Sequence, residues 1–586
     1  MLKTLFKETS GVRLVSALTP LCMVGEVVME MIVPRLMSSI IDDGVTAGNM
    51  QHIYTVGGWM IVAAIVGLIF GVGGAVFGSA AATGLARNLR KSMFRNIQTF
   101  SFASIDKYST AGLVTRMTTD VTNIQNAYQM SLRMSIRAPA SLIVAMVMSF
   151  TINHQLASIY LVAAILLSCV LVFIMSHATR YFSAAFHKYD DLNESVQENV
   201  SAIRVVKAYV REKFEGEKFQ KASEGLRSLF MRAELILSWN SPAMMVTIYS
   251  CILLISWFGA RMIVSSGETA FTTGELMSML AYCMNILMSL MMLSIVFVMI
   301  SMSAASARRV AEVLDEKTEL HNPENPVMEV KNGAVEFDHV CFRYKKEGRD
   351  VLSDINLNIR SGETIGIIGG TGSAKSSLVQ LLPRLYDVSA GHVRVGGIDV
   401  RNYDIETLRN SVAMVLQKNE LFSGTIAENL RWGNENASQE ELEDACRQAC
   451  ADEFIERFPD KYETHIEQGG TNVSGGQKQR LCIARALLKK PKILILDDST
   501  SAVDTATDAK IRRSFAEKIP GTTVFIIAQR ISSVENADHV LVLDGGKVSG
   551  YGTPAEMLAT NAIYQEVFNS QKQGGGDFDE KKGGEA

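Results

Sequence analysis

The chain has 586 residues, of which 48% are hydrophobic and 20% are charged, and its mean hydropathy is +0.15. This composition is too apolar for an ordinary soluble enzyme of that length, and the formal net charge of −4 gives no indication of a nucleic-acid partner. The apolar excess lies mostly in the first half, which predicts a membrane domain joined to a soluble domain.

The predicted membrane domain covers residues 14–314 and follows a short amphipathic segment, residues 1–13, which is typical of a helix on the inner membrane surface. A bilayer needs about 20 apolar residues per helix. Residues 138–179 contain no Asp, Glu, Lys or Arg and are too long for one span, so we predict a break at the polar stretch 151–155. The six predicted spans are 14–41, 53–86, two helices within 138–179, 235–260 and 276–307.

Lysine and arginine gather in two of the connections between these spans, at residues 87–137 and 180–232. Positive charge marks the cytoplasmic side of a membrane protein. We therefore expect a multi-pass protein of the cytoplasmic membrane, with both termini and the soluble domain in the cytoplasm. Both connections have helical periodicity, which predicts membrane helices that extend beyond the bilayer.

Two features of the spans bear on a substrate. Glu26 and Glu30 lie one turn apart in the first span, where an acid marks a polar path or a cation site by default. The alternatives are a position near the membrane edge or an ion pair with Arg35. The sixth span is rich in methionine, which suits ligands of varied shape but also serves ordinary helix packing: Met277, Met279, Met284, Met288, Met291, Met292, Met299 and Met302. Together these features favour small amphiphilic, drug-like substrates, including cations.

A polar linker with two prolines, residues 315–333, precedes a change of periodicity. Short strands then alternate with helices, which predicts an α/β nucleotide-binding domain over residues 334–571. The tail, residues 572–586, consists largely of glycine and charged residues and is predicted to be disordered. The predicted strands are 334–342, 364–368, 492–496, 522–527 and 539–543.

Residues 369–376 form a P-loop between a predicted strand and a predicted helix. Small residues allow backbone N–H groups to close around a phosphate chain at the positive end of a helix. Lys375 adds a cation for the outer phosphates, and the Ser376 hydroxyl is placed to ligate Mg²⁺. Ala374 departs from the motif, which has glycine there. The alternative, a glycine-rich loop without a ligand, is disfavoured by the Lys-Ser pair at the expected offset. The predicted phosphate-binding residues are Gly369, Gly370, Thr371, Gly372, Ser373, Ala374, Lys375, Ser376 and Ser377.

The buried strand 492–496 ends in two acids, Asp497 and Asp498. A carboxylate that emerges beside a P-loop can hold Mg²⁺, and Asp497 is the candidate for that role. The next position is where a hydrolase places a base for the attacking water, and here it is Asp498.

A second glycine-rich turn, Ser474-Gly475-Gly476-Gln477, precedes a helix at 480–488. A soluble P-loop protein has little use for two such turns, but in ABC transporters the second turn is the signature motif. Residues 334–571 resemble an ABC nucleotide-binding domain throughout, and the six-helix half resembles the membrane domain of ABC exporters. The expected fold class is therefore an all-α six-helix transmembrane domain followed by an α/β P-loop nucleotide-binding domain.

The resemblance implies roles for further residues and names ATP and Mg²⁺ as cofactors. Tyr344 is similar to the aromatic residue that stacks on adenine, and Gln417 to the glutamine that senses Mg²⁺ and the membrane domain. Residues 467–470 resemble a segment that communicates with cytoplasmic loops, and residues 501–504 a loop that crosses the dimer interface. In the family, the signature contacts the γ-phosphate of ATP bound to the opposite subunit. The implied Mg²⁺ ligands are Ser376, Gln417 and Asp497.

Two positions depart from the family pattern. Asp498 stands where the family has a catalytic glutamate, and Gln529 stands where it has a switch histidine. Aspartate is one methylene shorter, and glutamine cannot carry an imidazolium charge. We predict a site that binds Mg-ATP well and cleaves it slowly.

This prediction implies a partner, because a homodimer would contain two impaired sites. The resemblance is to the degenerate-site subunit of bacterial heterodimeric multidrug exporters. The expected partner is a second ABC half-transporter with an intact glutamate and histidine, whose ATP this chain's residues 474–477 would contact. The alternatives are a lipid or peptide exporter or flippase, and a slow homodimer that acts as a nucleotide-gated regulatory membrane protein.

Overall fold

A computed structural model of the chain describes residues 1–267, 270–345, 347–498 and 503–574. The chain divides into two compact units. The helical unit consists of Met1–Thr99 and Tyr108–Glu316, and the α/β unit consists of Phe100–Lys107 and Lys317–Ala586.

Among the described residues, six helical segments of the helical unit are long and apolar enough to cross a membrane. The predicted break within residues 138–179 falls at Asn153, whose side chain accepts hydrogen bonds from the backbone N–H groups of Gln155 (3.0 Å) and Leu156 (3.1 Å) and so caps the next helix. The amphipathic segment before the first span forms a short helix that ends at Lys7. The helices are α1 (Leu2–Lys7), α2 (Arg13–Ser39), α3 (Met50–Ile97), α5 (Thr110–Thr115), α6 (Val121–Ile152), α7 (His154–Ser201), α8 (Ile203–Ala208), α9 (Glu212–Ser238), α10 (Asn240–Ser266) and α11 (Thr273–Asp315), with π-helical turns at Ile40–Thr46 and Arg116–Asp120.

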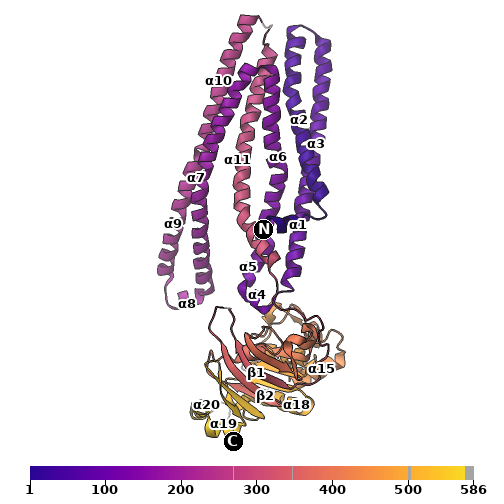
Figure 1. The fold of residues 1–586 in the computed structure, drawn as a ribbon, viewed down its shortest axis with the longest axis vertical. Helices are drawn as coiled ribbons and strands as arrows, with labels where there is room; N and C mark the ends of the chain where they lie inside the picture. The colour runs from indigo at the N-terminus through magenta and orange to yellow at the C-terminus, as the bar shows by residue number, and fades with distance from the viewer. Residues whose placement is uncertain (268–269, 346, 499–502, 575–586) are drawn as a thin grey trace. The chain divides into compact units, whose positions relative to one another are not determined.

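The long helices α2, α3, α6 and α11 run side by side, and α7, α9 and α10 form a second group (Figure 1). Two buried tyrosines fix helices to one another through backbone carbonyls. Tyr160 of α7 donates to Met279 in α11 (2.7 Å), and Tyr282 of α11 donates to Met31 in α2 (2.8 Å). Both tyrosines belong to the buried apolar core of the helical unit, where these bonds satisfy their hydroxyl groups.

The α/β unit contains two larger sheets. The first has six strands in the order β12-β11-β3-β10-β9-β6, of which β11, β3, β10, β9 and β6 are mutually parallel. The second has four antiparallel strands in the order β2-β1-β4-β5, and β7 pairs with β8 separately. The strands are β1 (Val335–Phe342), β2 (Leu352–Ile359), β3 (Thr364–Ile368), β4 (Ala390–Val395), β5 (Ile398–Asp399), β6 (Val412–Val415), β7 (Gly424–Thr425), β8 (His465–Ile466), β9 (Ile493–Asp497), β10 (Thr523–Ile527), β11 (His539–Asp544) and β12 (Lys547–Gly552).

Helices cover the six-stranded sheet, whose central strands β9 and β10 are buried at every position. Such continuous burial explains why these strands read as unbroken apolar runs in the sequence. The helices of the α/β unit are α4 (Phe102–Lys107), α12 (Lys375–Gln380), α13 (Ile405–Ser411), α14 (Ile426–Arg431), α15 (Gln439–Gln448), α16 (Asp452–Ile455), α17 (Gly475–Leu487), α18 (Thr505–Lys518), α19 (Pro554–Thr560) and α20 (Ala562–Gly574).

The position of α4 differs from the predicted division of the chain. Residues 14–314 were expected to form one membrane domain, but Phe100–Lys107 packs with the α/β unit. Phe100 and Ser104 are buried, and the Tyr386 hydroxyl donates a 2.6 Å hydrogen bond to Asp106. The helical pattern of the connection was correct, but its six-residue length gave no sign of which unit would bury it.

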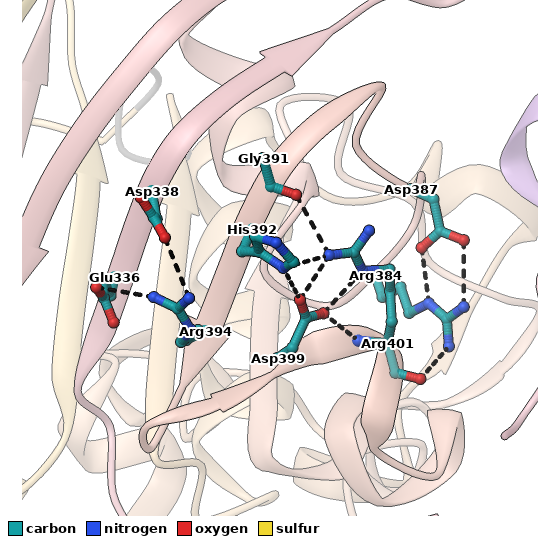
Figure 2. A network of polar contacts seen from close by, with 9 residues as sticks. All are labelled: Glu336, Asp338, Arg384, Asp387, Gly391, His392, Arg394, Asp399 and Arg401. Carbon is teal, nitrogen blue, oxygen red and sulfur yellow. Dashed lines mark hydrogen bonds and ion pairs between the residues drawn. The ribbon is translucent and has the colours of Figure 1, made fainter.

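A polar network stabilises the antiparallel sheet of the α/β unit (Figure 2). Arg401 donates to both carboxylate oxygens of Asp399, at 2.9 and 2.6 Å, and its own backbone N–H donates to the same carboxylate. Burial alone would raise the pKa of Asp399, but the hydrogen bonds from Arg401 and His392 outweigh it and lower the pKa to about 2. Arg394 similarly joins β4 to Glu336 and Asp338 of β1.

Candidate functional site

The predicted site residues follow four neighbouring parallel strands. The P-loop follows β3, Gln529 follows β10, Asp497 and Asp498 end β9, and Gln417 follows β6. The carboxyl ends of parallel strands meet at one edge of a sheet, which is where open α/β sheets bind ligands. The fold therefore gathers at one edge residues that are up to 160 positions apart in the sequence.

The P-loop backbone explains why the motif needs glycine. A Cβ at Gly369 would lie 2.2 Å from the carbonyl oxygen of Leu543, so no side chain fits there. Gly372 has a φ of 83°, which is a left-handed conformation. Ala374 also has a left-handed backbone, with a φ of 70° and ψ of 25°, at the N-cap of α12. Alanine therefore adopts the conformation that the usual glycine would adopt, at a cost of about 1 kcal/mol.

Lys375 begins α12 and folds back over the loop. Its ammonium group donates to the carbonyl oxygens of Gly369 (2.8 Å) and Gly370 (2.9 Å). Burial lowers the pKa of Lys375, and the nearby carboxylates of Asp497 and Asp498 oppose that shift. The cation thus lies between the glycine-rich turn and the two acids, a position suited to the outer phosphates of a nucleotide.

Two of the three predicted Mg²⁺ ligands are in contact. The Ser376 hydroxyl donates a 2.9 Å hydrogen bond to a carboxylate oxygen of Asp497, which is 4% exposed. Burial raises the pKa of Asp497, and the bond from Ser376 opposes the shift. A hydroxyl and a carboxylate are hard oxygen ligands, so this pair fits Mg²⁺. Gln417 lies at the same sheet edge but is exposed, and in the part of the chain that the structure describes it makes no hydrogen bond to either residue.

Asp498 and Gln529, the two positions that depart from the family pattern, are bonded to each other. The side-chain amide of Gln529 donates to a carboxylate oxygen of Asp498 at 2.8 Å. Asp498 also has a left-handed backbone (φ 48°), and its N–H donates to the carbonyl of Ile527. Burial raises the pKa of Asp498, while the bond from Gln529 opposes the shift. The carboxylate is therefore held by a neighbouring amide at the position where a hydrolase orients water.

The loop that carries Gln529 is itself held by the C-terminal helix. Gln571 in α20 donates to the Gln529 carbonyl (2.8 Å) and accepts from the N–H of Ile531 (2.8 Å). Nothing in the sequence pointed to Gln571, because an isolated glutamine in a polar helix carries no motif.

Tyr344, the candidate adenine-stacking residue, follows β1 and is 46% exposed. Its hydroxyl lies 2.8 Å from the Ser377 hydroxyl in α12, which ties it to the helix that begins the phosphate site. The edge of its ring meets the ring of Tyr386 at a centroid distance of 5.2 Å. These contacts fix a partly exposed aromatic ring beside the helix that begins at the P-loop.

The signature turn is a helix cap. Ser474 caps α17, since its hydroxyl accepts from the N–H of Gln477 (3.3 Å) and the Gln477 side chain accepts from the N–H of Ser474 (2.9 Å). Gly475 and Gly476 form the first turn, whose N–H groups point out of the helix end. Among the described residues, no hydrogen bond or ion pair joins 474–477 to the P-loop of the same chain.

The structure describes one of two other predicted segments in part and the other in full. Ser501 and Ala502 lie outside the described residues, whereas Asp504 caps α18 by accepting from the N–H of Thr507 (2.9 Å). In the segment 467–470, Gly469 and Gly470 both have left-handed backbones (φ 72° and 66°), and Lys478 of the signature helix donates to the Gly469 carbonyl (2.7 Å). The segment is thus bonded to the helix that the signature begins.

Two family models match the chain: the ABC transporter transmembrane region over residues 17–291, and the ABC transporter domain over residues 352–501. An uncharacterized ABC transporter ATP-binding protein of Bacillus subtilis (strain 168), YfiB, is 35% identical over 558 residues, which are 95% of this chain and 96% of that protein. This chain belongs to the ABC transporter family.

Another relative of this transporter, a probable multidrug resistance ABC transporter ATP-binding/permease protein (YheI) of Bacillus subtilis (strain 168), is 30% identical and covers 93% of each chain. The structure of a bacterial Atm1-family ABC exporter with ATP bound matches the fold with a TM-score of 0.79 at 23% identity, over 97% of this chain and 98% of that one. The predicted fold class is therefore confirmed. The chain is an exporter-type half-transporter with fused transmembrane and nucleotide-binding domains, and its ATPase domain drives transport with ATP.

The acids of the first span in this transporter are paired with an arginine other than Arg35. Arg137 of α6 makes ion pairs with Glu26 and, at 2.9 Å, with Glu30. The suggested partner, Arg35, instead contacts Glu275 at 3.4 Å. The alternative of a pair with Arg35 therefore does not hold, because Arg137, which the sequence placed in a cytoplasmic connection, turns its side chain toward α2. The triad borders a cavity of about 510 Å³ between α2 and α3.

The methionines of α11 do not share one environment. Met279 is fully buried in the helical core, as ordinary packing requires, while Met277, Met284 and Met288 are about half exposed. The Met302 side chain lies outside the described residues. Methionine content alone therefore did not distinguish packing positions from surface positions.

Proposed function

We propose that this chain is one half of a heterodimeric exporter of amphiphilic, drug-like compounds in the cytoplasmic membrane, with both termini in the cytoplasm. Its own P-loop holds Mg-ATP and cleaves it slowly. Its signature, Ser474–Gln477, completes the working site of a partner half-transporter that has the catalytic glutamate and the switch histidine.

The observation that carries this proposal is the 2.8 Å hydrogen bond between Gln529 and Asp498. A general base must reach the proton that it removes, and placement errors of about 1 Å can reduce the rate about 100-fold. Aspartate already lacks one methylene, and the amide of Gln529 occupies one of its oxygens. Ser376, Asp497 and Lys375 keep the arrangement that binds phosphate and Mg²⁺, so binding and cleavage are separated.

Within the chain's own site, each residue has a distinct task. The P-loop N–H groups and Lys375 would hold the phosphates, Ser376 and Asp497 would hold Mg²⁺, and Tyr344 would stack on the base. Mg²⁺ supplies charge neutralisation at the phosphates. Asp498 and Gln529 hold each other, so a water near them is oriented poorly.

The need for a second subunit is supported by surfaces that a single chain leaves exposed. The signature lies on the surface of the α/β unit, and among the described residues no hydrogen bond or ion pair joins it to the P-loop of the same chain. In the helical unit, the turn at α8 exposes large apolar side chains: Val205 is 57% exposed, Tyr209 74% and Val210 80%. Patches of this kind mark protein interfaces. The drug-like substrate class rests on the composition of the spans and on the name of the relative YheI.

The test is to purify the full-length chain alone and together with a candidate partner half-transporter, and to measure phosphate release in lipid nanodiscs. We expect slow release by the chain alone and at least tenfold faster release by the pair. A Ser474→Ala substitution in this chain should reduce the activity of the pair, because that serine would act on ATP bound by the partner. Equal rates for the chain and the pair would refute the heterodimer and favour a slow homodimer.

A further inference from the structure

A cavity of about 440 Å³ lies where α1 packs against α3 and the end of α11 (Figure 1). Its volume is within the range of small-molecule sites, about 300–1,000 Å³. Three cations line it, Lys3 and Lys7 from α1 and Arg95 from α3, together with two acids, Glu8 and Asp315. All of these residues belong to the helical unit, so the cavity is separate from the predicted nucleotide site.

The acids of this cavity have hydrogen-bond partners, whereas its cations do not. Glu8 accepts a 2.7 Å hydrogen bond from the Ser92 hydroxyl of α3, and Asp315 accepts one from the Thr4 hydroxyl of α1 at 3.0 Å. These bonds hold α1 against α3 and α11. In the part of the chain that the structure describes, the side chains of the three cations make no hydrogen bond or ion pair. The cavity therefore presents unpaired cationic donors, which suit an anionic ligand.

The cavity lies at the level where α3 leaves the predicted membrane-spanning region. Residues 53–86 contain no charged residue, and Arg87 is the first cation after them. At the next position, Asn88 donates to the backbone carbonyl of Glu8 (2.9 Å) and so fixes the end of α1 at this turn. Arg95 lies about 12 Å farther along the helix. Its side chain leans toward the N-terminus of α3, which is toward the membrane, so the cation is within reach of the lipid headgroups.

Exposed apolar side chains accompany the cations. Phe6 of α1 is 66% exposed, Phe94 of α3 is 56% exposed, and Leu14 at the start of α2 is 75% exposed. A helix at a membrane surface places such side chains at the boundary of the acyl chains and its cations among the headgroups. The surroundings of the cavity thus match both parts of a phospholipid, whereas a soluble anion would use the cations alone.

We propose that the cavity lined by Lys3, Lys7 and Arg95 binds the phosphate of an anionic phospholipid, in the leaflet on the side where α11 ends. Basic pockets between membrane helices bind headgroups of this kind. A guanidinium can donate two parallel hydrogen bonds to a phosphate, and each lysine adds a point charge. Free phosphate shares this chemistry but has no acyl chains to contact Phe6 and Phe94. The site requires no particular partner subunit, because α1, α3 and α11 come from one chain.

The experiment titrates the full-length chain, in micelles of a non-ionic detergent, with dioleoyl phosphatidylglycerol and counts bound lipid by native mass spectrometry. Parallel titrations use dioleoyl phosphatidylcholine and inorganic phosphate. Phosphatidylglycerol should bind more tightly than phosphatidylcholine, whose choline group neutralises the phosphate. Lys7→Gln and Arg95→Gln should each weaken phosphatidylglycerol binding about fivefold, the contribution of one cation near an anionic headgroup. The matched control is Arg87→Gln, which removes the same charge from α3 outside the cavity and should change the affinity less than about twofold.

A substitution of opposite sign keeps the test decisive if a cation variant does not fold. Asp315→Asn retains an acceptor for the Thr4 hydroxyl but removes a negative charge beside the phosphate, so it should strengthen phosphatidylglycerol binding. Equal losses in Arg87→Gln and Arg95→Gln would overturn the proposal, because general surface charge would then explain binding. Equal affinity for the two lipids, or no gain in Asp315→Asn, would also overturn it. Displacement of the lipid by an equal concentration of inorganic phosphate would assign the site to the free ion instead.

Discussion

Restoring the catalytic pair should require both substitutions at once. Asp498→Glu lengthens the carboxylate by one methylene, but Gln529 still donates a hydrogen bond to it. Gln529→His removes that amide, but the aspartate remains too short. The structure therefore predicts that Asp498→Glu/Gln529→His raises cleavage far more than the product of the two single effects.

The magnitudes follow from the contact. A hydrogen bond to a carboxylate contributes about 1.5–3 kcal/mol when buried, and the partial exposure of Asp498 reduces this to about 1–1.5 kcal/mol, or roughly tenfold in rate. A positioned general base contributes about 10²–10⁴-fold. We expect at most about tenfold for Asp498→Glu, little change for Gln529→His, and about 10²–10³-fold for the pair.

The assay is single-turnover cleavage of Mg-ATP by excess full-length chain, followed by phosphate release. Adding Lys375→Ala to the double variant should abolish the gain, which would show that the cleaved ATP is held by this chain's P-loop. If Asp498→Glu alone equals the double variant, the Gln529 bond does not restrain the carboxylate. If the double variant is no faster than the starting chain, these two positions do not limit cleavage, and the reasoning from the site fails.

Three further outcomes are expected. Ala374→Gly should change the free energy of unfolding, measured by urea denaturation, by less than about 1 kcal/mol. The substitution removes the strain of a left-handed alanine, but glycine has more conformational freedom in the unfolded chain, and the two effects offset each other. The affinity for Mg-ATP, measured by calorimetry, should stay within about threefold. Asp399→Asn should lower the free energy of unfolding at pH 7 by about 1 kcal/mol, allowing for solvent screening. Folding lowers the pKa of Asp399 from 3.8 to about 2, so the carboxylate stabilises the folded chain above pH 3.8. The difference between the two proteins in urea titrations should therefore disappear as the pH falls from 3.8 to about 2. Arg137→Met should lower the melting temperature in nanodiscs, because it leaves Glu26 and Glu30 of α2 without their cation; the expected loss of stability is about 2 kcal/mol. Neutralising both glutamates in the same variant should restore the melting temperature.

Sequence patterns were sufficient for features that depend on local chemistry. The break at Asn153 could be predicted because a polar residue interrupted an otherwise charge-free stretch, and the same residue caps the next helix. Ser376 and Asp497 could be named in advance as candidate Mg²⁺ ligands from their motifs, which follow the parallel strands β3 and β9 of one sheet, with β10 between them. Ala374 was recognisable as a departure, but only the backbone shows that its φ of 70° reproduces the glycine conformation.

Features that depend on long-range packing could not be predicted. Arg137 pairs with acids more than 100 residues away, and a basic residue near the end of a basic connection gave no reason to expect it. Gln571 holds the Gln529 loop from the last helix, again without a motif. In each case the residue type is common, and its role arises from the place to which the rest of the fold brings it.

The burial of α4 in the α/β unit also affects how the chain is made. Asp106 leaves the ribosome 280 residues before Tyr386, with which it bonds. At about 5–20 residues per second, about 15–60 s pass before the surface that buries Phe100 and contacts Phe102 has been synthesised. During that interval α4 has no α/β surface to pack against and its apolar side chains remain exposed. Because of this order of synthesis, α4 is a segment at which a nascent chain can bind chaperones or misfold. A variant that slows folding of the α/β unit should therefore be lost to degradation before it reaches the assembled transporter.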